Sequence, residues 1–170
     1  MKALSRATAV AVLLLVALPA SSIAANPVTI DFSTHGQGPF DQSFYESDGV
    51  IFIQGSFVGY IQGDEALVGP VAGIFKPKVS SLSVRVAPAN QGTAIYTLSA
   101  LSSSGELVAS TSVTVTQDEG DPANSVWGYF TLDLGPLPKK ARSFTLTNTF
   151  VRSSFSLTTS IEFGVSVLSF

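Results

Sequence analysis

Apolar residues alternate with serine and threonine along most of the chain. This two-residue period is typical of β-strands that bury one face and expose the other. No window beyond residue 25 shows the sustained 3.6-residue stripe of an amphipathic helix. We therefore expect a chain of short strands and no substantial helix. The clearest alternating runs cover residues 82–86, 94–100, 112–116, 129–134, 143–147 and 161–167.

Glycine, proline, asparagine and clustered serine separate these runs and supply the chemistry of turns. About ten strands result, at the 8 to 12 residue spacing of an all-β sandwich or barrel. Polar outward faces favour antiparallel pairing, so we predict an antiparallel β-sandwich. The run Ser104-Gly105-Glu106 is predicted to close a hairpin. The apolar end at Phe170 is expected to be paired inside a sheet.

The first 25 residues have the pattern of a secretory signal peptide. Lys2 and Arg6 provide a basic start, residues 9–18 are apolar, and small residues follow. This apolar stretch is shorter than the roughly 20 residues that a membrane-spanning helix needs. We expect residues 1–25 to be removed and residues 26–170 to form one domain in the secreted protein, extracellular or periplasmic, without a membrane span.

The net charge and the cysteine content exclude several classes of partner and site. Without Lys2 and Arg6, 7 basic residues of the original 9 stand against 12 acidic ones, a net charge of −5. Nucleic acid and anionic membranes are therefore not expected partners. The chain has no cysteine, which excludes disulfides, cysteine-based metal sites and thiol catalysis. About 145 residues are enough to form an unaided hydrophobic core.

Five segments, in the same order, resemble a family of bacterial exported jelly-roll domains, many of which occur in proteins with a PEP-CTERM sorting tail. The family patterns are D-F, D-Q-x-Y-x-x-x-G-V-x-F, F-x-x-P-V-x-x-V, L-x-A-x-d-x-x-G-x-x-V and G-I-D-N-L-x-F. The resemblance spans nearly the whole exported chain and implies a jelly-roll β-sandwich similar to galactose-binding and carbohydrate-binding modules. The matching segments are residues 29–32, 41–52, 74–84, 98–108 and 164–170.

The chain departs from this family in two places. The aspartate of the closing pattern is replaced by Ser166, which weakens any inherited ion or ligand site. No sorting motif follows Phe170, so we expect no surface anchor.

The inventory for catalysis is small, and we predict no catalytic residues. His35 is the one histidine and lies in a polar turn, so several imidazoles cannot share a zinc ion. Residues 55–59 have the wrong spacing for a nucleophile elbow. Asp64 and Glu65 would point to opposite faces of a strand, and Glu106 lies at a hairpin. A secreted hydrolase is the least favoured alternative.

Calcium is a candidate structural cofactor, because it takes oxygen ligands from carboxylates and loop carbonyls. In jelly rolls the first and last strands are often neighbours, which would bring Asp31 and Asp41 towards Glu162. These three residues are the predicted metal ligands. If Ile30 and Phe32 point inward, Asp31 points outward, and a solvated strand residue is the alternative interpretation.

Carbohydrate binding needs an aromatic surface bordered by polar groups. Trp127 and Tyr129 share a strand face, whereas Phe130, Leu132 and Leu134 share the other. If the second face packs in the core, Trp127 and Tyr129 point outward together, and they are the predicted ligand-binding pair. A core position for Trp127 is the alternative. The aromatic residues considered for such a surface are Trp127, Tyr129, Tyr45 and Tyr60.

The expected function is non-enzymatic binding of extracellular carbohydrate, a preference that comes from the resemblance. The first alternative is a structural or protein-interaction module of the matrix or envelope, in which edge strands contact an extracellular protein partner. A fold by itself does not decide between them.

Overall fold

The computed structural model describes residues 27–55, 57–61, 64–88, 92–117, 129–152 and 163–170. These residues contain no α-helix and no helix long and apolar enough to cross a membrane. The predicted signal peptide lies outside them. The elements are β1 (Thr29–Asp31), the 3₁₀ turn η1 (Phe32–Thr34), β2 (Gly38–Pro39), β3 (Val50–Gln54), β4 (Phe57–Ile61), β5 (Asp64–Val68), β6 (Val71–Val79), β7 (Ser83–Pro88), β8 (Gly92–Leu101), β9 (Leu107–Gln117), β10 (Phe130–Asp133), β11 (Ala141–Arg152) and β12 (Phe163–Ser169).

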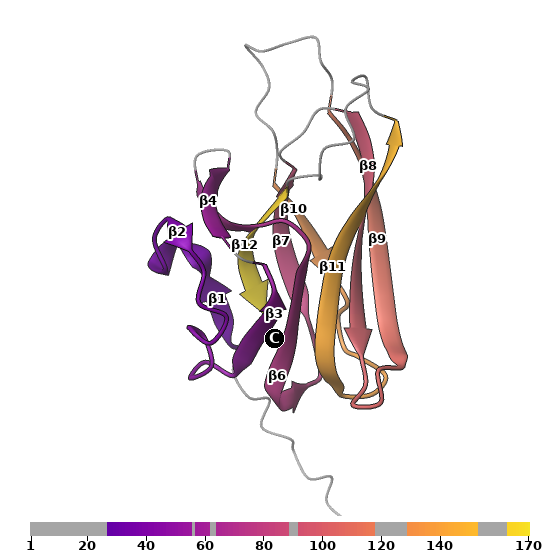
Figure 1. Ribbon diagram of the computed structural model, residues 1–170. Helices are drawn as coiled ribbons and strands as arrows, with labels where there is room; N and C mark the ends of the chain where they lie inside the picture. Colours follow the sequence, from indigo (N-terminus) through magenta and orange to yellow (C-terminus); the bar gives the residue numbers. More distant parts are fainter. Residues whose placement is uncertain (1–26, 56, 62–63, 89–91, 118–128, 153–162) are drawn as a thin grey trace, which may run out of the picture.

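Two antiparallel sheets form the layers of a β-sandwich (Figure 1). Sheet A has seven strands in the order β10-β7-β12-β5-β4-β2, with β1 also paired to β12. Sheet B has five strands in the order β3-β6-β11-β8-β9. The prediction of an all-β antiparallel sandwich is confirmed. Its jelly-roll subtype stays a prediction.

The core lies between the sheets and is built from the apolar half of each alternating run. In β8, Ala94, Tyr96, Leu98 and Ala100 are at most 3% exposed, while the residues between them are partly exposed. Burial along β8 therefore follows the two-residue period of the sequence. Aromatic rings fill the centre of the core, and the most deeply buried are Phe32, Phe52, Phe75 and Phe144.

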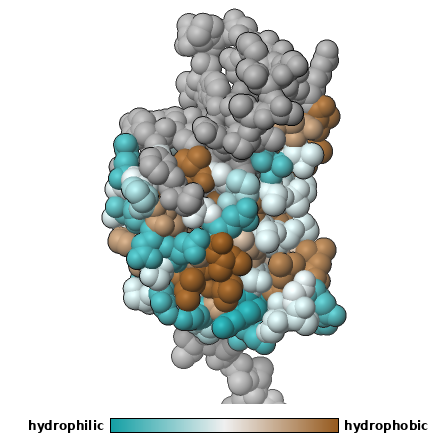
Figure 2. Space-filling model, viewed as in Figure 1, coloured by the Kyte–Doolittle hydropathy of each residue, from teal (hydrophilic) through white to brown (hydrophobic). Residues whose placement is uncertain are grey.

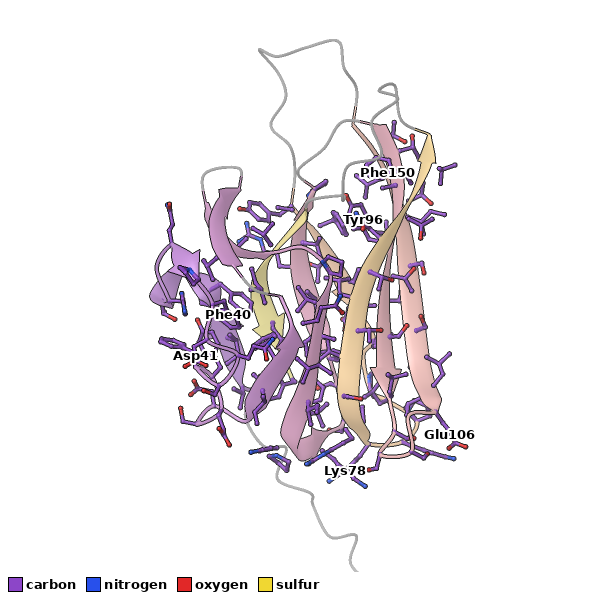
Figure 3. The ribbon with its side chains drawn as sticks, viewed as in Figure 1. Phe40, Asp41, Lys78, Tyr96, Glu106 and Phe150 are labelled. Carbon is purple, nitrogen blue, oxygen red and sulfur yellow. The ribbon has the colours of Figure 1, made fainter. Side chains whose placement is uncertain are left out.

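The predicted hairpin connects β8 and β9. The amide of Ser102 donates to the carbonyl oxygen of Glu106 at 2.8 Å, and the amide of Gly105 donates to Ser102 O at 3.1 Å. Gly105 has a φ of +82°, a conformation that glycine adopts without a steric penalty. The hairpin end carries Glu106, labelled in Figure 3.

Strand β1, the first described strand, pairs with β12, the last one. Strand β12 lies between β7 on one side and β5 and β1 on the other, so it is an interior strand of sheet A. Ile30 lies opposite Leu168, and Val28 and Phe170 exchange two backbone hydrogen bonds of 2.9 and 3.0 Å. The first and last strands are therefore neighbours, as expected from the resemblance to jelly rolls.

Candidate functional site

Tyr129 lies on the outer face of sheet A, directly before β10. Its ring packs against Ala66 and Ala87, whereas Phe130 and Leu132 pack in the main core. The alternation predicted for this run is therefore confirmed from Tyr129 to Leu134. Tyr129 is partly buried, and the guanidinium carbon of Arg85 lies 3.8 Å from the centre of its ring. This cation–π contact occupies one face of the ring.

None of the other aromatic residues considered from the sequence is shown to expose its ring among the described residues. Trp127 lies outside the described residues, and so does the side chain of Tyr60. Tyr45 is only 4% exposed, so it packs in the interior and offers no open ring. Whether Trp127 and Tyr129 bind a ligand together stays a prediction.

Asp31 faces solvent between buried Ile30 and Phe32, as the strand period predicts. Its Oδ1 accepts a hydrogen bond of 2.9 Å from the amide of Ser33 and so caps η1. Its backbone carbonyl oxygen accepts a 3.0 Å bond from the Tyr45 hydroxyl. The carboxylate therefore has a structural role at the end of β1.

Asp41 makes the same kind of local contact in the next turn. Its Oδ1 accepts hydrogen bonds from the amide and the hydroxyl of Ser43, at 2.9 and 2.8 Å. These bonds stabilise the charged carboxylate and lower the pKa of Asp41, with a smaller lowering from nearby His35. Glu162 lies outside the described residues, and within those residues no three carboxylate or imidazole groups converge as metal ligands would. Calcium binding stays a prediction.

The segment from η1 to β3 presents a cluster of aromatic rings. Phe32, Phe40 and Tyr45 are buried within it, with ring centres 5.6 to 6.1 Å apart. Phe44 extends this cluster to the surface and is 48% exposed. Its ring centre lies 4.7 Å from that of His35 in an edge-on arrangement, and 4.9 Å from that of Tyr45. We call Phe44, His35 and Asp41 the Phe44 surface.

Successive turns hold the Phe44 surface in place. The amide of Phe44 donates to Asp41 O at 3.0 Å, and that of Asp48 donates to Tyr45 O at 3.1 Å. Buried Tyr45 anchors the segment, because its hydroxyl lies 3.1 Å from Thr34 Oγ1 in addition to its bond to Asp31. Figure 3 shows Phe40 and Asp41 close together at this side of the sandwich. The Phe44 ring is therefore presented on an ordered support.

The residues that flank Phe44 in the sequence are mostly polar. Glu46 forms an ion pair with Lys76 of β6, which ties the segment to sheet B. Nδ1 of His35 lies 2.8 Å from the carbonyl oxygen of Gly36. Gln42, Ser43 and Asp48 are exposed along the same segment. The His35 imidazole therefore contacts the Phe44 ring, and further polar groups lie close to it in the sequence.

A second surface covers the outer face of sheet B. Along β11, β8 and β9 most of its residues are threonine and serine, which give the pale area over these strands in Figure 2, and the exceptions include Ile95, Leu101 and Val151. Three cross-strand hydroxyl pairs hydrogen-bond at 2.9 to 3.1 Å: Thr93 with Thr116, Thr97 with Ser112, and Ser99 with Ser110. Each such pair contributes less than about 1 kcal/mol to sheet stability.

Reasoning from the sequence missed Phe44. Its signal is a phenylalanine inside a run of polar and turn-forming residues, Asp41-Gln42-Ser43-Phe44-Tyr45-Glu46-Ser47-Asp48, where a purely packing role is unusual.

No protein-family model matches the chain, and no curated protein sequence is significantly similar to it.

Proposed function

We propose that this protein is a secreted, non-enzymatic module that binds extracellular carbohydrate through the Phe44 surface. The observation that carries the proposal is the half-exposed ring of Phe44 beside His35 and Asp41. Secretion follows from the signal-peptide pattern of the first 25 residues.

The chemistry of sugars supports this surface. A pyranose ring has an apolar C–H face that packs against an aromatic ring, and its edge carries hydroxyl groups. Phe44 supplies the aromatic face. Asp41 is ionised at neutral pH and has lone pairs beyond the two hydrogen bonds from Ser43, so it can accept bonds from sugar hydroxyls.

The fixed conformation of the segment that carries Phe44 also favours binding. Tyr45 and the turns around it fix the backbone under Phe44, so little conformational freedom is lost when a ligand binds. Tyr129 supports carbohydrate binding less strongly, because Arg85 covers one face of its ring. A second contact through Trp127 and Tyr129 is part of the same proposal and is tested separately.

Binding to a glycan array, followed by calorimetry with the best ligand, tests the proposal. Phe44→Ala should weaken binding by roughly tenfold or more, the typical effect of truncating an anchoring aromatic residue. Val151→Ala is the matched control, because it also truncates an exposed apolar residue, one on β11 that is 60% exposed. It should leave both binding and the melting temperature unchanged.

Two results would contradict the proposal in different ways. If Trp127→Ala abolishes binding and Phe44→Ala does not, the ligand binds elsewhere and the Phe44 surface is wrong. If the protein binds no glycan at all, the carbohydrate function is wrong, and the structural or protein-interaction alternative is favoured.

A further inference from the structure

Strand β9 differs from every other described strand that has a single neighbour. Strands β1, β2, β3 and β10 are two to five residues long, β2 contains Pro39, and β3 has an irregular register between Phe52 and Gln54. Short length, proline and bulges are the features that keep edge strands from pairing with other chains. Strand β9 has eleven residues, and its register to β8 is regular from Ala109 to Gln117.

The sequence of β9 lacks the usual edge protection. Leu107–Gln117 contains no charged residue, no proline and no glycine. When an edge strand pairs antiparallel with its own copy, a charge near the middle of the strand comes close to the same charge of the other copy, which opposes pairing. In β9 nothing of this kind opposes pairing. Its many threonine and valine residues also favour extended structure.

The core is incompletely covered along the same edge. Val113 and Val115 point towards the core, yet both remain partly exposed, whereas their neighbours Tyr96 and Ala94 on β8 are at most 3% exposed. The reason lies in the opposite sheet. Of the described strands of sheet A, β10 makes the main contacts with β9, and it has only four residues. Pairing with another strand would remove the remaining apolar area from water.

We infer that the protein forms a two-fold symmetric dimer in which β9 of one copy pairs antiparallel with β9 of a second copy. The two copies of sheet B then join into one continuous sheet. A second copy fits this edge because the strand carries no charge that would oppose pairing with itself and places its half-covered valines opposite those of its partner. The hydroxyl-bearing outer face would also continue across the two-fold axis. Figure 1 shows β9 at the margin of the sandwich, opposite the side that carries β1 and β2.

Mass measured over a range of protein concentrations tests the dimer. We expect the exported protein to run as a dimer that dissociates on dilution. The variant Ser112→Lys/Thr114→Lys places two exposed lysines on β9 and should shift the protein to monomer at concentrations where the wild type is dimeric. Its matched control is Thr147→Lys/Thr149→Lys, which adds the same charge at exposed positions of β11, an interior strand of sheet B. The control should remain a dimer.

Spin labels locate the interface independently of the lysine variants. Because the chain has no cysteine, Ser112→Cys and Thr147→Cys each carry a single label. With the valines of the two copies opposite one another, residue 112 pairs with residue 116 of the second copy. Labels at residue 112 should then lie roughly 14 Å apart between backbones, and labels at residue 147, five strand spacings across the sheet, roughly 28 Å apart.

A monomer at every concentration would overturn the inference, and so would a dimer whose labels at residue 112 are farther apart than those at residue 147. Neither outcome bears on carbohydrate binding, because the Phe44 surface lies on the segment between η1 and β3. Phe44→Ala should therefore leave the dimer unchanged.

Discussion

The ring of Phe144 on β11 occupies the space that a side chain at Gly73 on β6 would need. The two residues are directly opposite in the register of sheet B. A Cβ atom on Gly73 would lie 2.6 Å from Cε1 of Phe144 and 3.2 Å from the carbonyl oxygen of Ile51. Phe144 also stacks on Phe75, with ring centres 5.3 Å apart, so the ring cannot easily move away.

Gly73→Ala should therefore destabilise the protein by about 1–3 kcal/mol through overpacking. Denaturant unfolding measures the change. Adding Phe144→Leu to this variant should recover part of the loss relative to the sum of the two single changes, because the smaller side chain makes room for the new methyl group. Strict additivity would contradict this interpretation of the Gly73–Phe144 contact.

Two buried tyrosines predict a loss of stability at alkaline pH. Burial raises the pKa of Tyr45 and of Tyr96 above the ordinary value of 10.0, and the hydrogen bonds of Tyr45 with Thr34 and of Tyr96 with Asn148 offset part of the rise. Above pH 10 the unfolded chain releases these protons first, so unfolding becomes more favourable as the pH rises. Below pH 10 the two protonated tyrosines contribute their full stabilisation to the folded state. This contribution is lost as the pH rises through their higher pKa values in the folded protein.

The melting temperature should consequently fall between about pH 9 and pH 11, together with the appearance of tyrosinate absorbance. Tyr45→Phe and Tyr96→Phe should each make this fall shallower, because each removes one of the perturbed groups. If neither substitution changes the slope of the melting temperature against pH, other residues cause the alkaline loss of stability.

Calcium binding by Asp31, Asp41 and Glu162 predicts a melting temperature that rises with added calcium and falls in chelator. A ligand at 100 times its dissociation constant stabilises the native state by about 2.7 kcal/mol. Asp31→Asn and Asp41→Asn should reduce the rise, because an amide cannot supply the charge that a calcium site needs. Equal melting temperatures in chelator and in millimolar calcium would contradict the prediction.

The hydroxyl pairs of sheet B should contribute little to folding. Thr97 Oγ1 and Ser112 Oγ are 2.9 Å apart on the solvent face. Because water can replace this bond on unfolding, Thr97→Val should change the free energy of unfolding by no more than about 0.5 kcal/mol, as measured by denaturant titration. By contrast, Leu98→Ala, one residue along and fully buried, should cost about 2–5 kcal/mol. Similar costs for both would contradict the assignment of the two faces.

The strands were predictable because their pattern is local. Each alternating run identifies its own buried face, as Ala94 to Ala100 do in β8, and Gly105 identifies the hairpin that follows. The pairing of the first and last strands was expected from the resemblance to jelly rolls, and it is confirmed by the register of Ile30 with Leu168.

The candidate site could not be predicted in the same way. Phe44 and Tyr45 are adjacent aromatic residues in a segment of successive turns, where no two-residue period states which side faces inward. The contacts of Tyr45 with Asp31 and Phe32, residues of the first strand and its following turn, place it inside and leave Phe44 outside.

The sequence by itself determined the all-β class, the inward face of each regular strand and the position of the hairpin, because these depend on neighbours two to four residues apart. The tertiary structure decided which aromatic ring stays open and that Arg85 covers Tyr129. It also decided that β9 lies at an edge. Exposure and strand order depend on contacts between residues distant in the chain, and no local pattern encodes those contacts.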